Sequence, residues 1–410
     1  MMIAVDRDGS ASLDELADLL RAAGVASVGE AIQKRTEPDP DRYFGKGRLE
    51  DLKAELERTG ANLVACDDEL APRQERNLER FLGVPVIDRT AIILDIFASQ
   101  ARSAEGKLQV ELAQLEYNLA RMRGLWTHLE RLGAGIGTRG PGESQIETDR
   151  RLARDRITSL KGRIARVERN REVMRRRRRR GSIPQVALAG YTNAGKSSLL
   201  SALCGCEVAT GDRPFHTLDP LTRSFRQGGA RFLLTDTVGF IEKLPHQLVD
   251  AFRATLEETV LSDILLLVVD GSGGEERIVR ELAASEAVLN EIGAGDKPRV
   301  TVLNKVDLLD SETCEELALT RPDAIQVSAA TGQGLDRLSL ALSELIEQGM
   351  EPVELLVPYS EGARLSEIHE LAGSLSRTEH EDGVRISARL PADEVHRFAD
   401  LVVSGPASGN

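Results

Sequence analysis

The spacing of apolar and polar residues divides the chain into segments of different character. Up to about residue 102, short apolar runs alternate with amphipathic stretches. The runs "MIAV", "ANLVACD" and "VPVID" are typical of short strands, whereas "SLDELADLLRAAG" and "RLEDLKAELERTG" are typical of helices. We expect Ser12 to cap the first helix and Gly60 to end the second. The pattern therefore predicts an N-terminal α/β domain over residues 1–102.

Residues 103–181 have a different period, with apolar residues at alternating intervals of four and three. Two such heptad seams should pack two helices against each other as an antiparallel coiled-coil hairpin. Each arm would be roughly 40 Å long, with a glycine-rich tip loop at residues 133–144. The first seam contains Leu108, Leu112, Leu115, Leu119, Met122, Trp126 and Leu129, and the second contains Ala153, Ile157, Leu160, Ile164, Val167 and Met174.

From residue 183, continuous apolar runs typical of buried parallel strands lead into glycine-containing loops. The stretch "IPQVALAGYTNAGKSSLL" combines such a run, a G-x-x-x-x-G-K-S loop and an apolar helix start. This is the context that a P-loop requires, because its backbone N–H groups and the following helix N-terminus surround phosphates. Lys196 should reach the β- and γ-phosphates, and Ser197 should bind Mg²⁺.

Two further segments are predicted to sense the γ-phosphate. "RFLLTDTVGF" is a strand that ends in D-x-x-G, where Asp236 would hold Mg²⁺ through water and the Gly239 N–H would contact the γ-phosphate. In "FHTLDPLTR", Thr217 would close on Mg²⁺ and the γ-phosphate, unless it is an ordinary loop threonine. We therefore predict Lys196, Thr217 and Gly239 as catalytic, and Ser197, Thr217 and Asp236 as the metal site.

The base should be guanine. "PRVTVLNKVD" ends in N-K-x-D, and the Asp307 carboxylate can accept hydrogen bonds from two guanine N–H groups that adenine does not match. The motif order predicts a GTP-binding domain over residues 182–349. Its predicted GTP contacts are Gly190, Tyr191, Thr192, Asn193, Ala194, Gly195, Lys196, Ser197, Ser198, Phe215, His216, Thr217, Leu218, Asp219, Asp236, Thr237, Val238, Gly239, Asn304, Lys305, Asp307, Ser328, Ala329 and Ala330.

Phe240 follows D-x-x-G directly, where Ras-like enzymes place a glutamine that orients the attacking water. A phenyl ring cannot do this. We therefore expect slow basal hydrolysis and stimulation by a macromolecule that orders these segments.

Residues 350–410 form a small α+β module by pattern. "VELLVPY", "LSEIHELAG", "VRISARLP" and "ADEVHRFADLV" predict strand, helix, strand and helix. The predicted fold is thus α/β, with a P-loop GTPase domain, an N-terminal α/β domain bearing a coiled-coil hairpin, and this module.

The distribution of charge along the chain indicates a further binding partner. The chain of 410 residues has a net charge of −13, yet residues 101–180 carry 21 Lys and Arg against 10 Asp and Glu. A basic segment in an acidic protein suggests a local contact with a polyanion. The candidates for RNA contact are Arg139 at the tip and the run Arg175, Arg176, Arg177, Arg178, Arg179 and Arg180. The alternatives are a plain turn for the tip and a solvated linker for the run.

Other classes of protein are disfavoured. There is no run of about 18 apolar residues to span a membrane and no signal peptide, so we expect a cytoplasmic protein. Cys204 and Cys206 form a lone C-x-C, which favours reduced thiols over a metal site.

Several long stretches resemble the HflX-family GTPases of the Obg-HflX superfamily. They include "YFGKGRLEDL", "DDELAPRQERNLE", "GIGTRGPGESQIETDRR", "FHTLDPLTR" and "DTVGFIEKLPH". The resemblance implies a GTPase that binds the large ribosomal subunit, with the hairpin loop near the RNA of the peptidyl-transferase region, and that splits or rescues stalled ribosomes. The family also has an apolar residue at the position of Phe240. His216 and Leu221 depart from the "FATLDPTTR" of many bacterial relatives, but Thr217 is retained.

Two other functions fit the same residues. One is a GTPase that acts on an immature large subunit during assembly. The other is a signalling G-protein whose helical hairpin binds a protein. A monomer requires the fewest assumptions.

Overall fold

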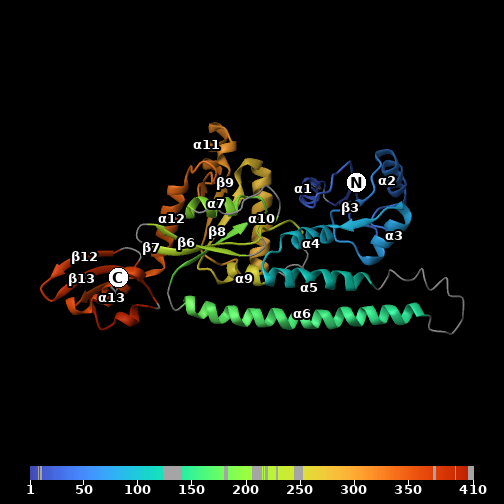
Figure 1. Cartoon of the computed structure of the whole chain (residues 1–410). Coiled ribbons are helices and arrows are strands. Elements are labelled where there is room, and N and C mark those ends of the chain that lie inside the picture. The colour runs from blue at the N-terminus through green and yellow to red at the C-terminus, as the bar shows by residue number, and fades with distance from the viewer. Residues whose placement is uncertain are drawn as a thin grey trace. The chain divides into compact units, whose positions relative to one another are not determined.

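The computed structural model describes residues 1–7, 9, 12–122, 141–179, 183–205, 215, 217, 220–227, 230–243, 253–372, 375–392 and 394–404. For residues 141–146, 170–179, 230, 253–255, 370 and 404 only the backbone is described. The chain forms two compact units (Figure 1). The first contains Met1–Glu168, Asp212–Asp219 and Lys243–Arg253, and the second contains Arg169–Gly211, Pro220–Glu242 and Ala254–Asn410.

The first unit contains a four-stranded parallel sheet with the order β2-β1-β3-β4. Its strands are β1 (Met2–Asp6), β2 (Glu30–Lys34), β3 (Val64–Cys66) and β4 (Val86–Asp88). The helices between and after them are α1 (Asp14–Ala22), α2 (Lys46–Thr59), α3 (Pro72–Leu82) and α4 (Arg89–Gln100). Apolar residues of sheet and helices, such as Ile3, Leu49, Leu52, Val64 and Leu78, form one buried core.

The helix ends agree with the predictions in one of two cases. Gly60 ends α2 in the left-handed conformation, with φ of 66°. The predicted cap Ser12 is wrong by one residue, because Leu13 occupies the N-cap position of α1. Ser12 nevertheless accepts a hydrogen bond from the N–H of Asp14 at 3.2 Å.

Two long helices, α5 (Ala104–Arg121) and α6 (Pro141–Arg179), follow the sheet. Ion pairs Arg156–Glu111 at 2.6 Å and Lys161–Glu116 at 2.8 Å join them. The shared apolar cluster contains the predicted seam residues Leu108, Leu112, Ile157, Leu160 and Ile164. Residues 141–144 are helical and not part of a loop as predicted, since proline is well suited to the first position of a helix. The seam residues Trp126 and Leu129, and the tip from 133 to 140, lie outside the described residues.

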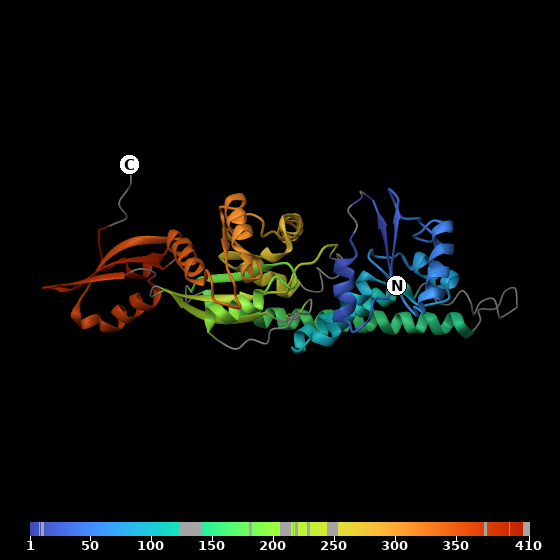
Figure 2. The same ribbon diagram turned by 90° about the horizontal axis from the view of Figure 1, so that it is seen from above.

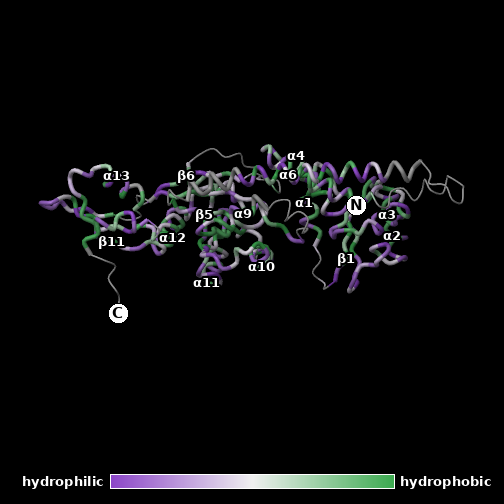
Figure 3. Tube along the Cα trace, turned by 90° about the horizontal axis from the view of Figure 1, so that it is seen from below, coloured by the Kyte–Doolittle hydropathy of each residue, from purple (hydrophilic) through white to green (hydrophobic). Residues whose placement is uncertain are grey.

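The second unit is built on a six-stranded sheet with the order β10-β9-β8-β5-β7-β6, in which only β6 is antiparallel to its neighbour. The strands are β5 (Gln185–Gly190), β6 (Leu221–Gln227), β7 (Ala230–Asp236), β8 (Ile264–Asp270), β9 (Arg299–Asn304) and β10 (Ala324–Gln326). The buried core of this unit contains apolar residues of β5 and of the elements around it. Hydrophobic residues are green in Figure 3, where they gather around the label of β5. The helices are α7 (Lys196–Cys204), α9 (Arg253–Leu261), α10 (Glu275–Glu291), α11 (Ser311–Thr320) and α12 (Leu335–Gln348), with short 3-10 helices at Gly271–Gly273 and Val306–Leu308.

The C-terminal part is a four-stranded antiparallel sheet with the order β12-β13-β11-β14. It contains β11 (Met350–Val357), β12 (Leu375–His380), β13 (Gly383–Pro391) and β14 (Val402–Ser404). Helix α13 (Gly362–Leu371), drawn in red in Figure 2, packs through Ile368 against Leu355 and Ile386.

The predicted last helix, over "ADEVHRFADLV", is wrong. A short 3-10 helix (Val395–Phe398) and then β14 take its place. Phe398 and Leu401 are buried in the core of this sheet, and β14 pairs with β11. This pairing with a distant strand outweighs the local preference for helix. None of the helices within the described ranges combines the length and the apolar character needed to cross a lipid bilayer.

Candidate nucleotide site

The loop between β5 and α7 has a backbone that only small residues allow. Asn193 and Gly195 have φ of 60° and 88°, in the left-handed region. A Cβ at Gly195 would lie 2.2 Å from Nδ2 of Asn304, and one at Gly190 would lie 2.0 Å from the carbonyl oxygen of Val268. Both glycines are therefore needed for the close approach of the neighbouring strands, and the loop curls at the N-terminus of α7.

Lys196 is the first residue of α7, and its side chain turns back over this loop. It is 6% exposed, and its Nζ donates hydrogen bonds to the carbonyl oxygens of Gly190 at 3.0 Å and Tyr191 at 2.7 Å. Burial lowers the pKa of Lys196 to about 8, against the opposing effects of Asp236 and Glu281. A cation that has lost much of its hydration would gain strongly from an anionic phosphate at this place.

Ser197 and Asp236 bring two oxygen atoms together beside the loop. The register of β5 with β7 places Asp236 opposite Leu188, and its side chain is fully buried. Ser197 Oγ donates a hydrogen bond to Asp236 Oδ2 at 2.6 Å. A hydroxyl and a carboxylate are hard oxygen donors of the kind that Mg²⁺ prefers, so the residues fit this ion.

The D-x-x-G segment is hydrogen-bonded along the loop. Phe240 N–H donates to Gly190 O at 2.9 Å, and Thr192 N–H donates to Phe240 O at 2.7 Å. A Cβ at Gly239 would lie 3.0 Å from Nζ of Lys196, so this glycine and this lysine are neighbours. The Phe240 side chain is 1% exposed and takes no part in a polar site.

Two further segments contact this loop or each other: the N-K-x-D motif, and residues 328–330. Asn304 Nδ2 donates to the carbonyl oxygen of Ala194 at 2.9 Å, and Ala329 N–H donates to Asn304 Oδ1 at 3.0 Å. Ser328 Oγ donates to Asp307 Oδ1 at 2.5 Å, which fixes the orientation of that carboxylate. The asparagine thus connects three segments that are far apart in the sequence.

Family comparisons decide what this arrangement is. Three family models match in succession: "GTP-binding GTPase N-terminal" at residues 10–98, "GTP-binding GTPase Middle Region" at 100–178 and "50S ribosome-binding GTPase" at 185–305. The GTPase HflX of Lacrimispora saccharolytica is 44% identical over 396 residues, which are 96% of this chain and 93% of that protein. The GTPase HflX of Escherichia coli is 42% identical, covering 94% of this chain and 91% of that protein.

The chain belongs to the HflX family of GTPases. It is a GTPase that binds guanine nucleotide and hydrolyses GTP. Among solved structures, it is similar to one described as the complex of SsGBP and GDP, with 28% identity, a TM-score of 0.45, and coverage of 85% of this chain and 98% of that chain. A second structure, of a GTP-binding protein from Sulfolobus solfataricus with GDP, has 27% identity and a TM-score of 0.42.

The structure does not gather all the predicted residues of this HflX-family site. Phe215 belongs to a segment of the first unit, where it is 2% exposed and packs edge-on against Phe97 of α4 at 4.6 Å. Thr217 belongs to the same segment. Outside the described residues lie the predicted contacts His216, Leu218 and Asp219, the RNA candidates Arg139 and Arg180, and Cys206. Arg175–Arg179 form the end of α6, with only their backbone described.

Sequence reasoning missed Asp270, which supports the site from the end of β8. Asp270 pairs with Lys305 at 2.7 Å and thereby holds the lysine of N-K-x-D, whose φ is 66°. The available signal was the carboxylate that ends the apolar run "ILLLVVD". Tyr191, one of the predicted GTP contacts, accepts a hydrogen bond at its hydroxyl from the N–H of Glu242 at 3.0 Å.

Proposed function

We propose that the segments joined by Asn304 form the GTP site. The Gly190–Ser197 loop would surround the phosphates, with Lys196 neutralising the β- and γ-phosphates and the Gly239 N–H turning to the γ-phosphate. Asp307, held by Ser328, would accept the guanine N–H groups. The observation that carries the proposal is the chain of contacts Ala194–Asn304–Ala329, because it brings the base-reading motifs to the phosphate loop.

Ser197 would bind Mg²⁺ through its hydroxyl, and Asp236 would act through a water molecule. Thr217 is the third proposed ligand. The support for this assignment is the contact of two oxygen donors at 2.6 Å beside Lys196. When bound, Mg²⁺ would supply positive charge that offsets the charge of the phosphates.

We propose that hydrolysis is slow in the isolated protein. Phe240 occupies the position that would orient the attacking water, and its ring is buried. Lys196 and the Gly239 N–H stabilise charge on the γ-phosphate but do not position a nucleophile. The rate should therefore depend on a partner that orders Thr217 and Gly239.

We propose the large ribosomal subunit as this partner, with the protein splitting or rescuing ribosomes in the cytoplasm as a monomer. The family model over residues 185–305 is described as a 50S ribosome-binding GTPase. Helices α5 and α6 would present the tip loop and Arg139 to RNA, and Arg175–Arg180 would contact phosphates. The proposed domains are residues 1–102, 103–181, 182–349 and 350–410.

The test is steady-state GTP hydrolysis with and without purified large subunits. We expect stimulation of at least about tenfold, as partner-supplied ordering can provide in GTPases. Greater stimulation by immature than by mature subunits would favour the assembly function. No stimulation by either would contradict a ribosomal partner and would favour a protein partner for the helical hairpin.

A further inference from the structure

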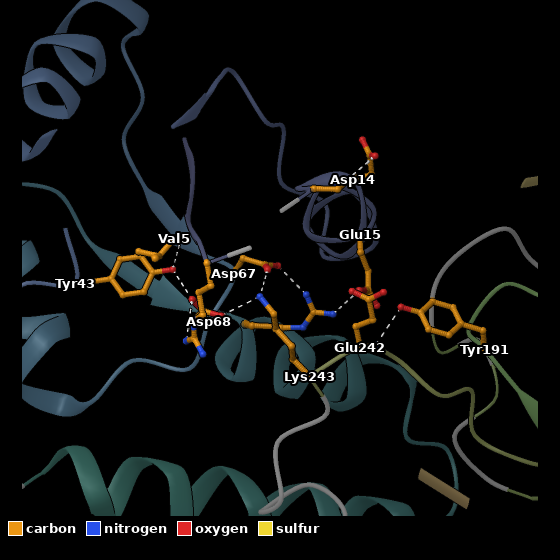
Figure 4. A network of polar contacts seen from close by, with 12 residues as sticks. Val5, Asp14, Glu15, Tyr43, Asp67, Asp68, Tyr191, Glu242 and Lys243 are labelled. Atoms are coloured by element: carbon orange, nitrogen blue, oxygen red, sulfur yellow. Dashed lines mark hydrogen bonds and ion pairs between the residues drawn. The ribbon is translucent and has the colours of Figure 1, made fainter. Parts of the chain in front are cut away.

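Lys243 lies three residues after Phe240 and is held by two carboxylates of the first unit. Its Nζ lies 2.6 Å from Oδ2 of Asp67 and 2.9 Å from Oδ1 of Asp68 (Figure 4). The lysine side chain is 49% exposed, but those of Asp67 and Asp68 are 7% and 12% exposed. The ammonium group therefore enters a site whose acceptors are largely removed from solvent.

The two carboxylates lie where a parallel sheet of this topology binds ligands. Asp67 and Asp68 directly follow β3, and in the order β2-β1-β3-β4 the chain changes direction between β1 and β3. Ligands of open α/β sheets bind outside the carboxyl ends of the strands at such a point. In this chain, Lys243 takes the position of the ligand.

Neighbouring side chains fix both carboxylates in place. Asp67 accepts a hydrogen bond from Arg89 at 2.7 Å, and Asp68 accepts one from the Tyr43 hydroxyl at 2.6 Å. Tyr43 in turn accepts the N–H of Val5, the last residue but one of β1, at 2.9 Å. Burial alone would lower the pKa of Lys243, but Asp67 and Asp68 outweigh it and raise that pKa, so the lysine enters charged.

The backbone at Lys243 is under strain. Its φ is 50°, in the left-handed region that non-glycine residues adopt at a cost. Phe215, two residues before Thr217, shares this feature with φ of 59°, and it too is held in the first unit, against Phe97. A strained residue fixed by contacts of the first unit thus lies within four residues of each predicted γ-phosphate sensor, before Thr217 and after Gly239.

The chain between Gly239 and Lys243 has little freedom to absorb a movement. Phe240 N–H is bound to Gly190 O, and Glu242 N–H is bound to the Tyr191 hydroxyl. A rotation of Gly239 toward a γ-phosphate would break or shift these bonds, and its effect would reach Lys243 within four residues.

We propose that Lys243 is a nucleotide-dependent anchor, which pairs with Asp67 and Asp68 when no γ-phosphate is bound and leaves them when Gly239 closes on GTP. This inference rests on the proposed role of Gly239. Because binding and release are linked, the two ion pairs oppose GTP and not GDP.

The test compares Lys243→Met with Lys243→Arg, which retains the charge, and with Lys161→Met, which removes a lysine paired with Glu116 on the helical hairpin. Dissociation constants are measured for GDP and for a non-hydrolysable GTP analogue, with thermal unfolding as a check on folding. We expect Lys243→Met to bind the analogue about fivefold more tightly relative to GDP. Lys243→Arg and Lys161→Met should keep the wild-type ratio. Asp68→Asn should shift it in the same direction as Lys243→Met.

An unchanged ratio in a folded Lys243→Met variant would overturn the anchor while leaving the nucleotide site intact. Wild-type protein that binds neither nucleotide would instead refute the proposed site, and the anchor with it.

Discussion

At the scale of single residues, Asp307 is the group on which base selection depends. Ser328 donates to Oδ1 of its carboxylate, and a carboxylate only accepts hydrogen bonds, so Asp307 suits the N–H groups of guanine. Replacing Asp307 with Asn puts N–H donors where guanine also has them. We expect GTP affinity to fall at least about tenfold and xanthosine triphosphate affinity to rise, measured by nucleotide titration.

Asp310→Asn is the matched control, because Asp310 caps α11 by accepting the Thr313 N–H, and asparagine caps helices as well as aspartate does. Unchanged GTP affinity in Asp307→Asn would show that Asp307 does not contact the base.

Lys196 is proposed to bind phosphate, but burying its charge lowers the free energy of unfolding. Its pKa in the folded, nucleotide-free protein is about 8, below the usual 10.5, because the side chain is buried. Between these two pH values the unfolded chain retains a proton that the folded chain has lost. The free energy of unfolding should therefore rise as the pH increases from 8 to 10.5, by about 2 kcal/mol.

Lys196→Met should lose this rise and also lose tight nucleotide binding, as shown by urea unfolding at several pH values and by titration. An equal rise in the wild type and in Lys196→Met would contradict the lowered pKa of this buried lysine.

At the scale of elements, the seam between α5 and α6 depends on a few apolar side chains. Leu160 is fully buried there, whereas Leu152 on the same helix is 59% exposed. We expect Leu160→Ala to lower the free energy of unfolding by about 2–4 kcal/mol, because it removes buried surface and leaves a cavity. Leu152→Ala should change it by less than about 0.5 kcal/mol. Equal effects in urea unfolding would mean that the two helices do not pack in solution.

The sequence predicted those elements whose signals are local. The strands β5, β7 and β9 are apolar runs that end directly in a motif, and the motif loops contain glycines at positions that require them. Strand β2 was not predicted, because "EAIQK" is largely polar and becomes a strand by pairing with β1. The helix predicted near the C-terminus failed for the same reason, since β14 is defined by its pairing with β11.

The candidate site shows the same limit. The proximity of Lys196, Ser197, Asp236 and Asn304 could be predicted because their motifs follow parallel strands and so lie at one edge of the sheet. Phe215 remains a predicted nucleotide contact, and the structure places it against Phe97 of α4. Its packing against Phe97 joins residues far apart in the chain, and no periodicity or motif encodes such a contact.

At the scale of the whole molecule, the compact units do not follow the order of the sequence. Segments 212–219 and 243–253 are grouped with the N-terminal part, although both lie between motifs of the nucleotide site. Of the two residues proposed to sense the γ-phosphate, Thr217 therefore belongs to the first unit. Gly239 belongs to the second unit, four residues before the segment of the first unit that begins at Lys243.

The distribution of charge over the whole chain favours a polyanion as binding partner. The basic stretch 101–180 includes the six consecutive arginines 175–180 in an otherwise acidic chain. Replacing Arg175, Arg176 and Arg177 with alanine should weaken binding to large subunits and reduce its salt dependence, because fewer counterions are released. An unchanged salt dependence would mean that these arginines do not contact phosphates.

Co-sedimentation with large ribosomal subunits, in GDP and in a non-hydrolysable GTP analogue at two salt concentrations, tests the central claim most directly. Our account predicts that the protein sediments with the subunits in the analogue, that much less does so in GDP, and that the higher salt concentration weakens the binding. Absence of binding in both nucleotides would contradict the ribosomal role and would leave a GTPase whose α5–α6 pair binds a protein.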